Sequence, residues 1–400
     1  MSRSDYSKTA KLNVYYGHAI SFFNQLIFSL GLWYVFGESF RGWNPLQIFI
    51  LFGVGWELSF FFEIPTGILA DKFGRLKVFR FGGLMQAIAY LTLGLSTNLY
   101  LLAIAMIINA VGAAAFSGTI DPIIGLSLSR ANSKNNIQNY QGNDLAISRI
   151  SRLIAISLAP LLYKVWPPLI FIGYSVSCLF AVFSSYGIRD YDIYEKPEES
   201  TILKHFKQAL LLIRDNKNLQ IVMFISVAFI NSELIWSLTQ PIGESIDLGV
   251  DKISFLFAVS VLISAVSALF LKKYYKGIYS IKALIIIRVT VVSLSLLVLL
   301  KMKAFLVLVV INIIVSVSVG ATRPYALTYF QHHVDRKYIS TVISIFSAAY
   351  SIALIVMNIA SGYLLKNYSI DAAIILGLVF SALSLISVGI LIRRADHEKP

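Results

Sequence analysis

The sequence predicts an all-α polytopic membrane protein with about twelve transmembrane helices in two halves of six. Of its 400 residues, 57% are hydrophobic and only 14% are charged, whereas soluble proteins carry about 25% charged residues. Apolar runs of roughly 18 to 25 residues recur along the chain, each long enough to cross a hydrocarbon core of ~30 Å as a helix. The ten-residue alternating pattern typical of membrane barrels is absent, so the spans are predicted to be helices.

The predicted spans are separated by short polar breaks. The first is too long for the apolar core of a cleaved signal, so we expect it to be retained. In order, the spans cover residues 13–36, 46–70, 79–97, 99–128, 145–165, 167–187, 219–240, 252–271, 281–300, 303–327, 338–364 and 370–392.

The longest polar interval divides the spans six and six. It predicts an amino-terminal bundle over residues 1–188, a cytoplasmic linker over 189–218 and a carboxy-terminal bundle over 219–400. Within the linker, Ile202, Phe206, Leu210 and Ile213 recur at helical spacing, which predicts an amphipathic helix at the membrane surface. A solvated linker helix is the alternative.

The distribution of basic residues predicts the orientation. The amino terminus and every second loop hold most of the 34 Lys and Arg residues. Short positively charged loops resist translocation, so both termini are expected in the cytoplasm, with the chain in the cytoplasmic membrane. The net charge of +13 is spread over these loops and forms no single basic face, which favours lipid headgroups over nucleic acid as its partner.

Several kinds of chemistry leave no trace in the sequence. The single cysteine, Cys178, cannot form an intrachain disulfide. No phosphate-binding loop, nucleophile elbow or metal-ligand spacing occurs. We therefore expect no cofactor, no metal and no enzymatic activity. A polytopic bundle of this kind indicates a secondary transporter or, less readily, a channel or embedded enzyme.

One polar stretch interrupts this apolar pattern, "FFEIPTGILADKFGRLK" at residues 61–77. Its Gly67, Asp71, Gly74 and Arg75 follow a G-x-x-x-D-x-x-G-R spacing at the predicted cytoplasmic turn between spans two and three. The chain here resembles the major facilitator superfamily, and "FEIPTG" resembles many of its bacterial efflux members. The resemblance implies two six-helix halves that rock around a central site.

These four residues are expected to form a cytoplasmic gate. Gly67 would let span two approach a neighbouring helix, and Gly74 would permit the turn. Asp71 would face the positive end of another helix, which the family resemblance suggests is span eleven. Arg75 would pair with a carboxylate. The alternative is that the basic residues serve topology alone.

Asp121 and Arg323 are ionisable residues in spans four and ten. Gly118, Asp121 and Pro122 match Gly320, Arg323 and Pro324 at a constant offset, which indicates duplicated halves. Asp121 is expected to pair with Arg75 as part of the gate, or with Arg323 across the central site.

Three further acids lie within predicted spans. Glu233, near Asn231, is the first candidate for binding a coupling proton or another cation, and Glu57 and Glu63 are the others. Structural, hydrogen-bonded roles are the alternative.

Polar residues within the spans are candidates for contact with a substrate. Asn24, Gln25, Asn109 and Asn231 are expected to bind a polar solute or to join helices. Tyr325 is expected to line the same site or to pack in the core.

The resemblance implies a monomeric transporter for a small-molecule substrate. Proton-coupled efflux of amphipathic drugs by antiport is the first expectation. Uptake of a sugar, peptide or other metabolite is the alternative, and a non-transporting receptor or scaffold is the third. Two drug-exporter signatures are missing, since Ile108 stands where an arginine is common and span five has Ala159 before Pro160 in place of glycine.

Overall fold

The computed structural model describes residues 3–116, 118–131, 136–190, 207–208, 210–228, 230–271, 278–334 and 338–396. Within these ranges all regular structure is helical, and no strand occurs. The all-α prediction is therefore confirmed. Of the predicted amphipathic helix, residues 201–206 and 209 lie outside the described residues, and 210–215 are helical.

The described chain forms two compact units. The first comprises Met1–Phe36 with Gly55–Lys196, and the second comprises Gly37–Val54 with Pro197–Pro400. The sequence boundaries place Gly37–Val54 in the first half, whereas its contacts place it with the second. The physical reason is close packing on α17 (Ile339–Asn367). Asn358 Nδ2 donates to the carbonyl O of Gly53 at 3.1 Å, and a Cβ built at Gly362 would lie 2.8 Å from Phe49 Cβ.

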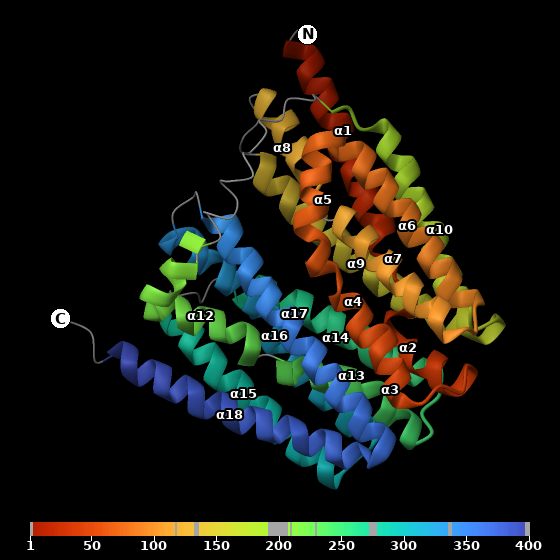
Figure 1. Cartoon of the computed structure of the whole chain (residues 1–400), viewed down its shortest axis with the longest axis vertical. Coiled ribbons are helices and arrows are strands. Elements are labelled where there is room, and N and C mark those ends of the chain that lie inside the picture. The colour runs from red at the N-terminus through yellow and green to blue at the C-terminus, as the bar shows by residue number, and fades with distance from the viewer. Residues whose placement is uncertain are drawn as a thin grey trace. The chain divides into compact units, whose positions relative to one another are not determined.

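The first unit is drawn in red to yellow-green in Figure 1. Its helices pack side by side, with α6 against α7 and α10, and α1 against α8, α9 and α10. Their bounds are α1 Arg3–Asn24, η1 Phe28–Gly31, α2 Trp33–Val35, α4 Gly55–Glu57, α5 Ser59–Phe73, α6 Arg75–Leu95, α7 Leu99–Phe116, α8 Ile120–Arg130, α9 Asn136–Val165, α10 Leu169–Ser184 and η4 Ser185–Gly187.

The second unit is drawn mainly in green to blue (Figure 1). Here α14 packs on α16, and α15 packs on α16 and α18. The bounds are α3 Pro45–Ile48, η3 Phe49–Val54, α12 Lys217–Ala228, α13 Ile230–Ser245, α14 Val250–Leu271, α15 Ile278–Lys301, α16 Phe305–His333, α17 Ile339–Asn367 and α18 Ile370–Asp396. The π-helical segment η2, Phe36–Phe40, lies at the boundary between the units.

Each predicted span overlaps one or more helical segments. In the described ranges nine helices are long and apolar enough to cross a membrane, or ten if the bent pair Asp5–Gly31 and Trp33–Phe40 is one span. The other two predicted spans fall on the apolar segment Phe305–Gly320 and on α12 with α13. The chain is therefore a multi-pass membrane protein.

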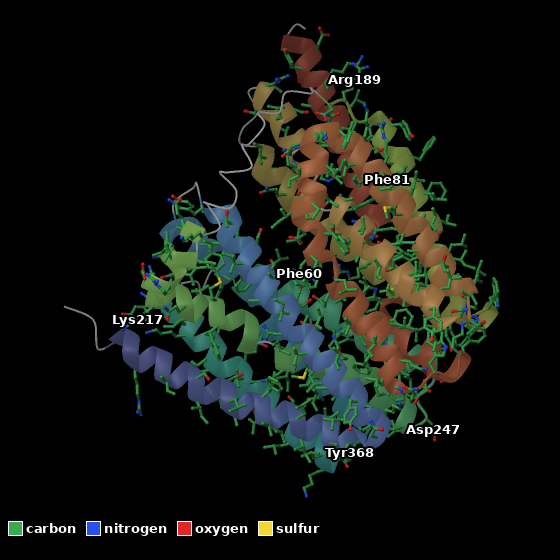
Figure 2. The ribbon with its side chains drawn as sticks, in the orientation of Figure 1. Phe60, Phe81, Arg189, Lys217, Asp247 and Tyr368 are labelled. Atoms are coloured by element: carbon green, nitrogen blue, oxygen red, sulfur yellow. The ribbon has the colours of Figure 1, made fainter. Side chains whose placement is uncertain are left out.

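Apolar side chains cover the outside of the helices. Phe81 on α6 is 60% exposed and projects away from its helix (Figure 2). Many leucine, isoleucine and phenylalanine side chains of the spans are similarly exposed. In a membrane protein such a surface is solvated by lipid, which explains why the spans stay apolar on faces that contact no other helix.

A glycine contact brings α6 and α7 together. A Cβ built at Gly82 would lie 2.8 Å from the carbonyl O of Gly112. Beside this contact, Gln86 Nε2 donates to Asn109 Oδ1 at 3.4 Å. Small residues allow membrane helices to pack closely, and amides then bond between them. The environment of Asn109 thus favours its alternative role as a contact between helices.

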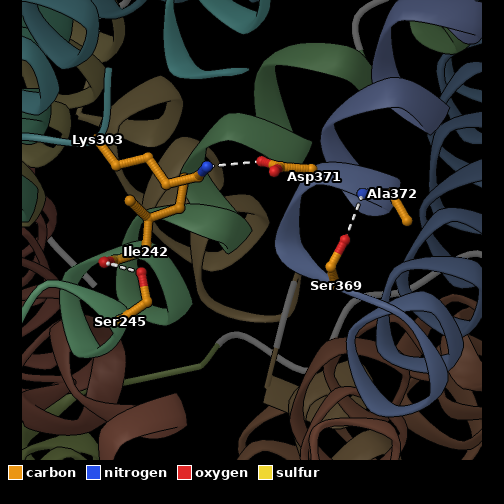
Figure 3. Close-up of polar contacts among 6 residues, drawn as sticks. All are labelled: Ile242, Ser245, Lys303, Ser369, Asp371 and Ala372. Atoms are coloured by element: carbon orange, nitrogen blue, oxygen red, sulfur yellow. Dashed lines mark hydrogen bonds and ion pairs between the residues drawn. The ribbon is translucent and has the colours of Figure 1, made fainter. Parts of the chain in front are cut away.

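Polar contacts at one end of the second unit join its helix ends (Figure 3). Lys303 Nζ lies 2.6 Å from Asp371 Oδ1, which links the α15–α16 turn to the first turn of α18. Ser369 Oγ accepts a hydrogen bond from the backbone N of Ala372 at 3.2 Å. An acid and a serine at a helix start satisfy its free N–H groups and its dipole.

Candidate functional site

A break in span one organises the candidate site of the first unit. Helix α1 ends at Asn24, and the next helical turn begins only at Phe28. Asn24 and Gln25, both predicted from the sequence, lie at this break. The last carbonyl groups of a helix have no partner within it. An interruption inside a span therefore exposes backbone oxygen atoms that need donors from other helices.

Three hydroxyl groups supply these donors. Ser151 Oγ of α9 donates to the carbonyl O of Phe22. Ser177 Oγ of α10 donates to the carbonyl O of Phe23 at 2.7 Å. The Tyr174 hydroxyl lies 3.2 Å from both the carbonyl O and the side-chain Oδ1 of Asn24. The broken end of α1 is thus capped entirely by neutral groups.

A half-buried cation lies beside this capped end. Arg152 of α9 donates from Nη2 to Gln25 Oε1, and its Nε is buried without a hydrogen-bond partner among the described residues. Arg152 is the midpoint of the span Asn139–Val165. The nearby charge on the same helix is that of Arg149, which has the same sign.

The known contacts of Arg152 roughly balance the cost of taking its charge out of water. Removing an ion from water costs several kcal/mol even after relaxation. A hydrogen bond from a charged group returns about 1.5–3 kcal/mol. The negative end of α1 adds at most about 2 kcal/mol. The position therefore adds little net stability, and ionisable groups inside membrane spans commonly serve function.

Aromatic rings extend from this site along the unit. The Tyr90 and Tyr174 rings meet edge to face at 4.4 Å between centroids. Trp56 Nε1 donates to the Tyr90 hydroxyl at 3.2 Å, and Trp33 contacts Trp56 at 5.7 Å. We call Trp33, Trp56, Tyr90 and Tyr174 the aromatic row.

A cluster of titratable groups lies further toward the start of α1. His18 Nδ1 lies 3.6 Å from Asp144 Oδ1, and the His18 ring stacks on Tyr140 at 5.0 Å. The Tyr140 hydroxyl donates to Asp121 Oδ1 at 3.3 Å. The partner of Asp121 in the structure is thus Tyr140. The side chain of Arg323 lies outside the described residues.

The predicted gate residues occupy the α5–α6 turn. Gly74 has φ 98°, a backbone conformation that favours glycine. Asp71 Oδ1 and Arg75 Nη2 are 3.5 Å apart across this turn. A Cβ built at Gly67 would meet no described atom within 4 Å. Asp71 and Arg75 therefore contact each other, and Gly67 has no close helix neighbour here.

A buried arginine lies in the second unit. Arg288 of α15 is 2% exposed, and its Nε donates to Ser232 Oγ of α13 at 2.7 Å. Glu233 lies near enough to attract the guanidinium electrostatically. Both polar atoms of the Asn231 side chain are buried without a hydrogen-bond partner in the described structure. Of the predicted residues, Glu233 thus lies near Arg288, and Asn231 precedes Ser232, which Arg288 contacts.

The other predicted residues lie apart from these groups. Glu57 is partly buried in α4, and Glu63 is exposed on α5. Tyr325 of α16 is 6% exposed and packs in the apolar core of the second unit, as its alternative role requires. No group of three or more His, Cys, Asp or Glu residues among those described could hold a metal ion.

Sequence reasoning missed the role of α9. The segment "NIQNYQGNDLAISRISR" is polar enough to be assigned largely to a loop, so Arg149 and Arg152 were expected at the membrane edge. The helix instead begins at Asn136. A signal was available, because the polar residues of this segment alternate with Ile147, Ile150 and Ile154 at helical spacing.

Comparisons with known proteins agree with this architecture. Residues 14–232 and 221–400 match the family described as the Major Facilitator Superfamily. The nucleoside transporter NupG is similar in structure, with a TM-score of 0.70, 15% identity and 100% of both chains covered. A mutant of NupG gives 0.72, 14% identity and coverage of 96% of this chain and 98% of that one.

The POT family transporter PepTSo is also similar, with a TM-score of 0.74, 12% identity and coverage of 97% of this chain and 99% of that one. At such identities the likeness concerns the fold alone. A comparison with curated protein sequences gave no match.

Proposed function

The chain belongs to the major facilitator superfamily, and we propose that it is a proton-coupled secondary transporter that moves a small polar organic solute by alternating access. Membership of the family makes the chain a transporter and not an enzyme. We place it in the cytoplasmic membrane of a bacterium, with both termini inside, on the asymmetry of its basic residues.

The observation that carries the coupling proposal is the environment of Arg288. Arg288 is 2% exposed inside a span, and Glu233 lies near enough to attract its guanidinium electrostatically. Protonation of Glu233 would remove its attraction for Arg288, so a proton and the local structure are linked. Ionisable groups inside membrane spans commonly mark the path of ions or substrates.

The polar side chains at the break in α1 favour a polar solute over an amphipathic cation as the substrate. Asn24, Gln25 and Arg152 meet at the break in α1, and an arginine there repels cationic drugs. Uptake of a metabolite therefore becomes the first candidate. Efflux of amphipathic drugs remains the second candidate, because "FEIPTG" resembles bacterial efflux members. The aromatic row adds little to it, since Trp33, Tyr90 and Tyr174 are at most 3% exposed and pack inside the unit.

The α5–α6 turn is proposed to act as the gate. The Asp71–Arg75 contact across Gly74 holds two opposite charges at the helix end. Exchange of the Asp71 partner during the transport cycle would favour one access state over the other.

Transport by purified protein tests the function. The chain is reconstituted in liposomes, and solutes that raise its thermal unfolding midpoint are offered with and without an imposed pH gradient. The wild-type protein should accumulate a stabilising solute when the gradient is present. Glu233→Gln should bind the solute but lose the response to the gradient, because the residue can no longer exchange a proton.

Asp215→Asn is the matched control. Asp215 is an exposed acid outside the spans and pairs with Arg214 at 2.9 Å, so this variant should behave as the wild type does. Gradient-driven accumulation that persists in Glu233→Gln contradicts the coupling role. Solute binding without accumulation in any vesicle indicates a receptor or scaffold instead.

A further inference from the structure

We propose that Arg152 binds the anionic group of the transported solute, so that the substrate is a small organic anion such as a carboxylate or a phosphate ester. The inference deepens the proposed transport function and rests on it. It follows from the position of the guanidinium, from the charges around it and from the donors it leaves unoccupied.

The depth of Arg152 in the membrane shows whether its anion is a solute or a lipid headgroup. Arg152 is thirteen residues from each end of the span Asn139–Val165, which places it ~20 Å from either end along the helix. Phosphate groups of lipids lie at the membrane surface, beyond the reach of an arginine at this depth. An anion that reaches Arg152 therefore has to enter the protein.

No neighbouring element supplies a counter-charge among the described residues. On α1 the contact of Arg152 is the neutral Gln25, and His18 is seven residues away, or ~10 Å along the helix. On α10 the nearest partner is the neutral Tyr174. On α9 itself, Arg149 repels the guanidinium, and Asp144 is directed to His18.

The buried arginine of the second unit gives an internal comparison. Arg288 has both a hydroxyl acceptor in Ser232 and the negative charge of Glu233. Among the described residues, the acceptor that Arg152 contacts is the neutral amide of Gln25. The chain thus neutralises one arginine within a span and leaves the other positive, which points to an external anion for Arg152.

The carbonyl groups at the end of α1 do not replace that anion. Ser151, Ser177 and Tyr174 already donate to them. The Nε–H of Arg152 remains unoccupied. A planar carboxylate or a phosphate can accept from Nε and from an adjacent amino group together. Asn24 and Gln25, which are only partly buried, then contact the neutral part of the solute.

The first test is thermal unfolding of the purified full-length protein without added solute. If Arg152 had only a structural role, replacing it should lower the unfolding midpoint. Replacing a cation that has no counter-charge should not lower the midpoint, so Arg152→Gln is expected to unfold at the wild-type temperature or about 2 °C above it. Arg214→Gln, at an exposed arginine outside the spans, is the matched control.

The second test measures binding at constant ionic strength. Benzoate, succinate and glucose 6-phosphate are compared with benzamide, succinamide and glucose, and with benzylamine as a cation. At least one anion should raise the wild-type midpoint by about 2 °C or more while its neutral counterpart does not. The shift should vanish in Arg152→Gln, shrink in Arg152→Lys and persist in Arg214→Gln.

Three results overturn the proposal. The first is an anion-induced shift of the unfolding midpoint that survives in Arg152→Gln. The others are stabilisation by the neutral or cationic compounds only, and no stabilisation by any of the anions. If Arg152→Gln does not fold, Arg152→Lys takes its place in the comparison, and an undiminished shift there counts against the guanidinium site.

Transport assays with the same solutes separate this inference from the proposed function. An anion that binds through Arg152 but is never accumulated contradicts transport and leaves the site intact. Accumulation of benzylamine without any anion binding contradicts the site and leaves transport intact.

Discussion

Ser177 shows how a single hydroxyl supports an interrupted membrane helix. Its Oγ satisfies the carbonyl O of Phe23 at the end of α1. Ser177→Ala removes this donor and leaves the oxygen only the Leu26 N–H at 3.2 Å, so we expect a loss of about 0.5–1.5 kcal/mol in the free energy of unfolding. Thermal or detergent unfolding measures this loss.

A serine on the same helix provides the control. The Ser184 hydroxyl donates to the carbonyl O of Phe180, one turn earlier in its own helix, and that oxygen keeps its helical donor after substitution. Ser184→Ala is therefore expected to change stability by less than about 0.5 kcal/mol. Equal losses in the two variants would show that the Ser177 contact is unimportant.

Arg288 is expected to respond oppositely to Arg152. Arg288→Gln removes the guanidinium from Ser232 and Glu233 and leaves the carboxylate without its attracting charge. We expect destabilisation by about 2–3 kcal/mol, measured as a fall in the unfolding midpoint. Glu233→Gln in the same background should recover part of the loss, and no recovery would contradict a coupling between the two residues.

At the residue scale, the sequence singles out polar side chains that contrast with their surroundings. Asn24, Gln25, Asn231 and Glu233 stand out within apolar runs, and the structure brings Gln25 into contact with Arg152 and Glu233 near Arg288. Arg152 was missed because it lies near the polar start of predicted span five, residues 145–165, where a basic residue is readily counted with the cytoplasmic loop.

At the scale of elements, glycine determines how closely α6 and α7 pack. Gly82→Val would place carbon atoms against the backbone of Gly112, which cannot move aside without separating the helices. We expect a loss of about 1–3 kcal/mol. Gly125→Val is the control, since a Cβ built at Gly125 in α8 would meet no described atom within 4 Å.

Unfolding of both glycine variants in the same detergent measures the difference. A loss in Gly82→Val no larger than that in Gly125→Val would mean that helix propensity and not packing sets the cost.

Broken helices were not predictable from hydropathy. Span four is interrupted at Gly118, which has φ 67°, so that Asp121 lies in the first turn of α8. Its duplicate, Gly320, lies inside the continuous helix α16. The same local sequence pattern thus has two conformations, because neighbouring helices differ around it.

At the scale of the whole molecule, the orientation of the spans can be tested by chemical labelling. Cys178 is fully buried, so a membrane-impermeant maleimide should report added cysteines against a low background. Phe73→Cys is in the predicted cytoplasmic turn and Tyr368→Cys in a predicted external turn, and both positions are exposed, at 54% and 70%.

In intact cells, Tyr368→Cys should be labelled and Phe73→Cys should not, whereas permeabilised cells should label both. The reverse pattern would overturn the positive-inside assignment and the cytoplasmic position of the gate.

The gate makes a kinetic prediction at the same scale. Asp71→Asn removes a charge that contacts Arg75. A change of about 1.4 kcal/mol in the balance of access states corresponds to roughly tenfold in population. We therefore expect transport to slow by about that factor while solute binding in the thermal assay is retained. Loss of binding together with transport would indicate a structural role.

The sequence by itself determined the number and approximate bounds of the spans, the all-helical class and the family. These properties follow from local sums of apolar area and from one short motif, so a linear reading contains them. Only the tertiary structure decided where α1 breaks, that α9 begins at Asn136, that Gly37–Val54 packs on α17 and that Arg152 contacts the neutral Gln25, with no counter-charge in the part of the chain that is described. Each of these depends on contacts between residues far apart in the chain, whose free energies outweigh local preference.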